Sequence, residues 1–318
     1  MRIVFAGTPD FAQVHLKTLI EKGFDVVGVF TQPDRPKGRG HKLTPSPVKE
    51  TALSANIEVF QPLSFKKEPE FIETLRNLKP DLLVVVAYGL LLPQEVLDIP
   101  TFGAINVHGS LLPKWRGAAP IQRSLWNGDK ETGVTIMKIG LKLDAGDMLL
   151  KKVLPITDTD TSETLYEKLS VLGCEGLVEV INNLESYYQN AQVQDESMVT
   201  YAAKLTKEEA LLDFSLNYDV LDKYIRAFNP WPLAYFYLDD QMVKVYKAKV
   251  IKKENKGFNL GEIVSASKEG LEIAVGNGSL IITNMQLPNK KAMEFNDIFN
   301  SKADLFVPHK NLTFKPQL

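Results

Sequence analysis

The 318 residues include 44% hydrophobic and 24% charged side chains and carry a net charge of −2, a composition that excludes a disordered chain. A single cysteine, Cys174, excludes an internal disulfide framework and fits a reducing compartment. A strand-like segment begins at residue 2, and the longest apolar stretch is shorter than the roughly 20 residues of a membrane-spanning helix. We therefore expect a cytoplasmic protein with no membrane partner.

The first part of the chain alternates apolar strands with helical periodicity. Strands are predicted at residues 2–6, 25–31, 81–89 and 103–109, and helices at residues 10–23 and 68–78. This alternation predicts an α/β fold with a Rossmann-like, mostly parallel sheet that binds ligands at the carboxyl ends of its strands. His108 lies at one of these ends.

A hairpin and a long helix complete a predicted first domain, residues 1–189. Residues 132–139 alternate as a half-buried strand, which can pair with residues 146–156 across the turn "LDAG". Helical periodicity then covers residues 162–185. The polar, irregular segment 190–206 is predicted to be a linker, because it shows neither period.

The C-terminal residues 207–318 predict a second domain. Five short strands, divided by Gly and Asn turns, follow one helix and favour an oligonucleotide-binding (OB) type β-barrel. Residues 241–318 contain 12 Lys and 7 acidic residues, a net charge of +5, whereas residues 1–240 have a net charge of −7. A basic module on an acidic body suits a polyanionic partner, and a solvated lysine-rich face explains the same composition equally well.

Several cofactor motifs are missing. The turn "AGTPDFA" holds one glycine where a dinucleotide fold has three, which argues against a nicotinamide cofactor. None of the four histidines has a neighbouring His, Cys or Glu at ligand spacing, so no metal is expected. The nucleophile elbow of serine hydrolases is also absent.

Asn106 and His108 are the polar residues that emerge at the predicted sheet edge. Residues two apart on a strand face the same side, so the amide and the imidazole can address one small group together. An amide can donate to an oxyanion and an imidazole can relay protons, with Asp144 of "LDAGD" as a source of an orienting carboxylate. A polar strand end and an ordinary turn explain these residues as well, and the residues alone leave both explanations open.

The stretch "NVHGSLLPKWRGAAPIQRSLWNGD", followed by "LDAGD", resembles the signature of the tetrahydrofolate-dependent formyltransferases. Further motifs, "FAGTPDFA", "TQPDRPKGRGHKLTPSPVK", "VVVAYGLLLP" and "FNPWP", are similar to the branch of that family that acts on methionyl-tRNA. The resemblance implies a formyltransferase fold. It also implies transfer of a formyl group from 10-formyltetrahydrofolate to the α-amine of methionine on initiator tRNA, for translation initiation and without a metal.

The resemblance also assigns roles to individual positions. Asn106, His108 and Asp144 become the catalytic residues: the first two stabilise the oxyanion, and Asp144 orients His108. Folate contacts are implied for two segments, Ser110, Leu111, Leu112 and Pro113, and Tyr88, Gly89 and Leu90. The basic stretch 34–49 is, without the resemblance, best interpreted as a solvated loop. The resemblance implies that Arg39, Lys37 and Lys42 of this stretch contact tRNA. A monomer is expected.

Three other hypotheses stay open at this point. The closest keeps the chemistry and replaces the tRNA acceptor with a nucleotide sugar or a small amine. The second is a catalytically inactive RNA-binding protein on the same scaffold, against which Asn106, His108 and Asp144 count. The third is an oxidoreductase, which the missing glycines disfavour.

Overall fold

A computed structural model describes residues 1–37 and 42–313, and the chain forms two compact units. The first unit consists of Met1–Pro120, Glu131–Pro155 and Tyr166–Ala202, and the second of Ile121–Lys130, Ile156–Leu165 and Ala203–Leu318. The units are therefore interleaved in sequence. The division into domains 1–189 and 207–318 with a linker 190–206 stays a prediction.

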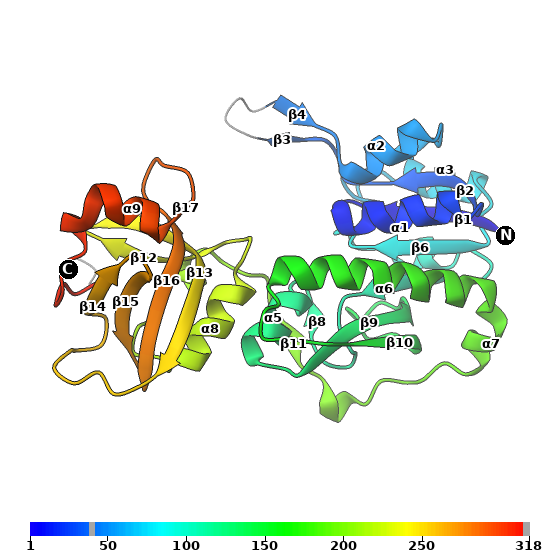
Figure 1. Cartoon of the computed structure of the whole chain (residues 1–318). Helices are drawn as coiled ribbons and strands as arrows, with labels where there is room; N and C mark the ends of the chain where they lie inside the picture. The colour runs from blue at the N-terminus through cyan, green and yellow to red at the C-terminus, as the bar shows by residue number, and fades with distance from the viewer. Residues whose placement is uncertain (38–41, 314–318) are drawn as a thin grey trace. The chain divides into compact units, whose positions relative to one another are not determined.

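The first unit is built on a seven-stranded sheet, in the order β10-β9-β7-β6-β1-β2-β5 (Figure 1). The strands are β1 Arg2–Gly7, β2 Asp25–Phe30, β5 Val59–Phe60, β6 Leu82–Val86, β7 Ala104–His108, β9 Glu131–Lys138 and β10 Met148–Pro155. Strands β5, β2, β1, β6 and β7 are parallel, and β9 and β10 are added as an antiparallel hairpin. The predicted mostly parallel sheet and its hairpin are confirmed.

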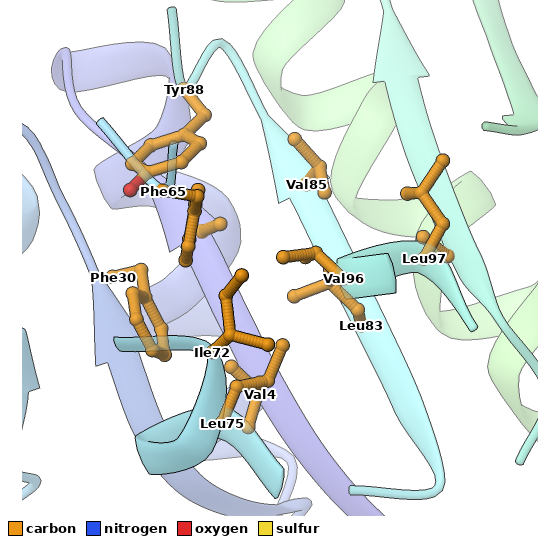
Figure 2. Close-up of a cluster of buried hydrophobic side chains, with 12 residues drawn as sticks. Val4, Phe30, Phe65, Ile72, Leu75, Leu83, Val85, Tyr88, Val96 and Leu97 are labelled. Carbon is orange, nitrogen blue, oxygen red and sulfur yellow. The ribbon is translucent and has the colours of Figure 1, made fainter. Parts of the chain in front are cut away.

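Helices cover both faces of this sheet. They are α1 Asp10–Glu21, α2 Pro47–Ser54, α3 Glu70–Asn77, α4 Gln94–Leu97, α6 Ser162–Asn182 and α7 Leu184–Gln189, of which α6 begins in the second unit. On one face, α3 and α4 bury Ile72, Leu75 and Val96 against Val4 and Val85 (Figure 2). Burial of such side chains, each worth about 1.5–3 kcal/mol, anchors the strands whose carboxyl ends form the site.

On the opposite face, His15 of α1 is fully buried next to α6. Its Nδ1–H donates to the Phe11 carbonyl at 2.6 Å, and Nε2 has no hydrogen-bond partner among the described residues. A Cβ added to Gly173 of α6 would lie 2.5 Å from Nε2, so the helices meet closely here. Burial penalises the charged ring and lowers the pKa of His15 to about 4, which the hydrogen bond to Phe11 only partly offsets.

We expect His15 to make the protein less stable in mild acid. Between pH 6.5 and about 4 the unfolded chain binds a proton at this ring and the folded chain does not, so the free energy of unfolding falls as the pH falls. At about 1.4 kcal/mol per pH unit, the loss over this window is roughly 3 kcal/mol. Urea unfolding at pH 7, 5.5 and 4.5 measures it. In His15→Met the part of the pH dependence that is due to His15 should disappear, while the contributions of the carboxylates, which both proteins share, cancel in the comparison. If the free energy of unfolding fell by the same amount with pH in both proteins, the assignment to His15 would be contradicted.

Two predicted loops contain regular structure. Within the basic stretch 34–49, β3 Arg35–Lys37 and β4 Lys42–Thr44 pair as an antiparallel hairpin, and α2 begins at Pro47 with Ser46 as its cap. The segment predicted as a linker contains a 3₁₀ turn, Glu196–Met198, and β11 Tyr201–Ala202, which pairs with β8 Arg116–Gly117. The predicted linker up to Ala202 therefore belongs to the first unit. It pairs with residues about 85 positions earlier in the chain, and hydrophobic periodicity cannot predict such a pairing.

The second unit contains an antiparallel sheet in the order β12-β13-β16-β15-β14, with β17 paired to β16. Its strands are β12 Ala234–Leu238, β13 Gln241–Lys252, β14 Ile263–Ser267, β15 Gly270–Val275, β16 Gly278–Gln286 and β17 Met293–Glu294. Its helices are α5 Pro120–Asn127, whose first residue belongs to the first unit, α8 Tyr218–Ala227 and α9 Phe295–Lys302. Two 3₁₀ turns, Glu208–Ala210 and Ala303–Leu305, complete it. All five predicted strands are present. The pairings among the described residues form an open path from β12 to β14, so closure into an OB-type barrel stays a prediction.

No helix within the described ranges is long and apolar enough to cross a membrane.

Candidate active site

Asn106 and His108 occupy one face of β7, at the end of the strand. Val107 between them faces α6, because a Cβ on Gly173 would approach it to 3.2 Å. Asn106 pairs in register with Val85 of β6, so the carboxyl ends of both strands lie at one edge of the sheet. The predicted common orientation of Asn106 and His108 therefore agrees with the strand geometry.

Asp144 is brought to this edge by the connection between β9 and β10. Its Oδ2 lies 3.8 Å from Nδ1 of His108, and the two side chains are only 13% and 7% exposed. The same Oδ2 accepts the Gly117 N–H at 2.8 Å. Asp144 has a left-handed backbone, with φ of 49°, a conformation that Asp tolerates better than most residues. The structure thus brings together the residues that sequence reasoning could only list side by side.

The hydrogen bonds of His108 decide which ring nitrogen can carry a proton in a reaction. Nε2 lies 2.9 Å from the carbonyl oxygen of Trp115. Because a carbonyl only accepts, Nε2 must carry a hydrogen and donate it. Nδ1, which faces Asp144, is the nitrogen left to gain or release a proton. The distance of 3.8 Å is longer than a hydrogen bond, and catalytic contacts often shorten only when substrate binds.

The Asn106 amide is the second available group. It is half-buried, and none of the described residues forms a hydrogen bond with its side chain. A half-buried amide without a protein partner can donate both N–H groups to a bound molecule at little cost in desolvation. Among the described residues, Asn106 can therefore donate to a ligand, and His108 with Asp144 has the geometry to carry a proton.

The segment Ser110 to Pro113 forms a buried turn after β7. Ser110 is fully buried and donates to the Lys114 carbonyl at 2.7 Å, and Thr135 of β9 donates to the Ser110 carbonyl at 2.7 Å. Leu112 is also fully buried and packs with Met137 and Met148. Leu111 and Pro113 are half-buried. Ser110 and Leu112 therefore hold the turn, Leu111 and Pro113 keep part of their surface accessible, and the folate contact of this segment stays a prediction.

The other predicted wall follows β6. The Tyr88 ring lies in the hydrophobic core beside Phe65, and burial raises the pKa of its hydroxyl above the usual range (Figure 2). Only its carbonyl faces polar neighbours, accepting from Thr8 Oγ1 at 3.1 Å and Gln32 Nε2 at 2.9 Å. Gly89 has a φ of 79° and Leu90 is half-buried. Gly89 is exposed and Leu90 keeps part of its surface accessible, whereas the Tyr88 side chain is part of the core; their folate contact stays a prediction.

Lys37 and Lys42 are the last register pair of the β3–β4 hairpin. Arg39 is outside the described residues. The implied tRNA contact of these three residues stays a prediction.

Gln194, Trp115 and Arg116 contribute to the site in ways that sequence reasoning did not assign. The Trp115 carbonyl accepts from His108, and Arg116, 3% exposed, donates to Gln194 Oε1 from Nε at 3.0 Å and Nη2 at 2.9 Å. Gln194 itself is buried in a segment whose polar sequence predicts a solvated linker. Arg116 and Gln194 are almost 80 positions apart, and sequence motifs relate only residues that are close in the chain, so no sequence signal could have found this contact.

No group of three or more His, Cys, Asp or Glu side chains arranged to hold a metal ion occurs in residues 1–37 and 42–313.

Comparison with known proteins places the chain in a family. Residues 1–181 match the family model of formyl transferase, and residues 204–303 match that of the formyl transferase C-terminal domain. The first match includes Asn106, His108 and Asp144.

Solved structures share the fold at low sequence identity. HypX from Aquifex aeolicus, solved with tetrahydrofolic acid, is 18% identical with a TM-score of 0.64; the alignment covers 94% of this chain and 47% of HypX, so the chain spans about half the length of HypX. An N-formyltransferase from Helicobacter canadensis, solved with folinic acid and dTDP-3-aminofucose, is 19% identical with a TM-score of 0.65 and coverage of 88% and 98%. Methionyl-tRNA formyltransferase from Clostridium thermocellum is 17% identical with a TM-score of 0.54 and coverage of 80% and 95%.

Proposed function

Because the chain belongs to the formyl transferase family, we propose that it transfers the formyl group of 10-formyltetrahydrofolate to the α-amino group of methionine on initiator methionyl-tRNA. The product is formylmethionyl-tRNA for translation initiation, made in the cytoplasm by a monomer. The family supports the reaction type. The acceptor is inferred from the residues of this chain.

The residues present fit a folate donor. Leu90 and Leu111 are half-buried apolar side chains on the two segments that leave the sheet edge, and Gly89 and Pro113 expose backbone beside them. A flat heteroaromatic ring with polar edges suits such a combination. The unpartnered Asn106 amide lies on the strand between these segments, where the formyl group of the donor would be held.

The site residues would act on the amine and the formyl carbon in complementary ways. 10-Formyltetrahydrofolate supplies the formyl group: the amine nitrogen bonds to the formyl carbon, the bond from that carbon to the folate nitrogen breaks, and one proton moves from the amine to that nitrogen. Asn106 donates to the oxygen that becomes negative during attack. His108 takes up and returns the proton at Nδ1, and Asp144 orients and balances the charged ring.

Exposed lysines on β13 support the choice of a nucleic-acid acceptor. Lys247, Lys249 and Lys252 are exposed, and within the described part of the chain none of them has a carboxylate within ion-pair distance. Unpaired cations on one strand attract a polyanion, since each neutralised phosphate releases a counterion. Together with the net charge of +5 over residues 241–318, they support a nucleic-acid acceptor. A small amine or a nucleotide sugar needs no such strand.

Acceptor competition tests the proposal. With 10-formyltetrahydrofolate as donor, we expect formylation of charged initiator tRNA and no measurable formylation of free methionine. The value of kcat/KM for tRNA should fall by at least about tenfold between 50 and 200 mM salt, because phosphate contacts are lost. A dTDP-amino sugar is the control acceptor. Faster formylation of that sugar, or equal rates on tRNA and free methionine, would refute the tRNA proposal while leaving the formyl-transfer chemistry intact.

A further inference from the structure

The connection that carries Asp144 has little support of its own. Leu141 and Leu143 are 70% and 68% exposed, and the backbone of the connection bonds to the sheet near its end, where Lys138 N–H donates to the Asp147 carbonyl at 2.9 Å. Asp144 also adopts a left-handed backbone conformation. A connection with exposed residues and few backbone hydrogen bonds moves unless another segment holds it.

Gln194 is the side chain that holds it. Its Nε2 donates one hydrogen to the Asp144 carbonyl and the other to the Gly146 carbonyl, both at 2.8 Å. Its Oε1 accepts two N–H groups from Arg116, at 3.0 and 2.9 Å. Every hydrogen-bonding position of this buried amide is therefore used: its two N–H groups donate to carbonyls of the Asp144 connection, and its oxygen accepts from Arg116 on the segment that follows His108.

Arg116 is in turn fixed on two sides. Its Nη2 pairs with Glu196 at 2.9 Å, and its backbone N–H donates to the Thr200 carbonyl at 2.9 Å. The neighbouring Gly117 N–H donates to Asp144 Oδ2. Two neighbouring residues thus hold Asp144. Gly117 binds its carboxylate directly, and Arg116 holds its backbone through Gln194.

We propose that Gln194 is a positioning residue for the reaction: anchored by Arg116, its amide holds the backbone of residues 144–146 so that the Asp144 carboxylate stays within reach of His108 Nδ1. This assignment rests on the proposed function for its catalytic meaning. The structural link between Gln194 and Asp144 can be tested without any enzyme assay.

Gln194→Glu is the sharpest variant. The carboxylate keeps the size of the side chain and still accepts from Arg116, but it cannot donate to the two carbonyls. Gln194→Met removes the donors without adding a charge, and it covers the case in which the new carboxylate prevents folding. Gln192→Glu is the matched control, because this exposed glutamine lies two residues earlier and undergoes the same change of charge.

Amide hydrogen exchange of Gly117 reports the position of the Asp144 carboxylate. We expect its exchange to accelerate by roughly tenfold or more in Gln194→Glu and Gln194→Met, since two hydrogen bonds to the connection are lost. Exchange of the Arg116 amide, which donates to Thr200, should change little, and Gln192→Glu should behave like the wild type. Unchanged Gly117 exchange in both Gln194 variants would overturn the proposal.

Single-turnover formyl transfer then separates positioning from a general structural role. Gln194→Glu should lower the rate about 10- to 100-fold with little change in the KM for the donor, because displacement by about 1 Å can cost that much. In an Asp144→Asn background the same substitution should have almost no further effect. An equal loss in both backgrounds would overturn the assignment. If the wild type transfers no formyl group at all, the proposed function fails, and the exchange experiment still decides the link to Asp144.

Discussion

Asn106→Ala should lower kcat by about a hundred- to a thousandfold, because it removes a hydrogen-bond donor that has no partner among the described residues. The donor matters most when the formyl oxygen becomes negative, so the effect should appear in kcat rather than in the KM for either substrate. The free energy of unfolding should change by no more than about 0.5 kcal/mol. The reason is that no described residue bonds to the Asn106 side chain.

Asn183→Ala provides the comparison for this experiment. Asn183 is an exposed asparagine whose Nδ2 donates to the Glu179 carbonyl at 3.0 Å, away from β7. Its replacement should leave kcat unchanged. Steady-state kinetics and thermal unfolding of both variants test the prediction, and an Asn106→Ala enzyme with more than about a tenth of wild-type kcat would rule out an oxyanion donor at this position.

Asp144→Asn should lower kcat by about a hundred- to ten-thousandfold, which is the range for loss of general acid–base catalysis. Asparagine has the shape of aspartate, tolerates the left-handed φ of 49°, and can still accept the Gly117 N–H through its Oδ1. What it lacks is the negative charge that balances a protonated His108. The variant should therefore fold normally and bind substrates, while proton transfer fails.

Asp147→Asn separates the local role of Asp144 from the charge of the connection. Asp147 lies three residues after Asp144, and its replacement by asparagine removes the same charge. The hydrogen bond described for Asp147 is made by its backbone carbonyl, which accepts from the Lys138 N–H. We expect kcat within about twofold of the wild type, because the carboxylate described 3.8 Å from His108 is that of Asp144 and not that of Asp147. Similar losses in both variants would indicate a general electrostatic effect instead of a partner for His108.

Much of the fold follows from periodicity. The alternation of residues 2–6, 25–31 and 103–109 with amphipathic helices predicts the parallel strands β1, β2 and β7, because a strand buried on both faces must be continuously apolar. The strand period also predicts that Asn106 and His108 share a face. By contrast, β3, β4 and β11 have only two or three residues each and form by pairing with other segments. Their sequences are too short to show a strand period, so they could not be predicted.

Sequence patterns predict the main strands and helices and the face that Asn106 and His108 share, and the sequence motifs carry the resemblance to formyltransferases. Only the tertiary structure decided that Nε2 of His108 is committed to Trp115, that Asp144 meets Nδ1, and that Gln194 belongs to the site rather than to a solvated linker. Local periodicity encodes which side chains face the core. The polar partners of Asp144 and Gln194 instead lie 27 and 78 residues away, at Gly117 and Arg116, and these contacts depend on the packing of the whole first unit.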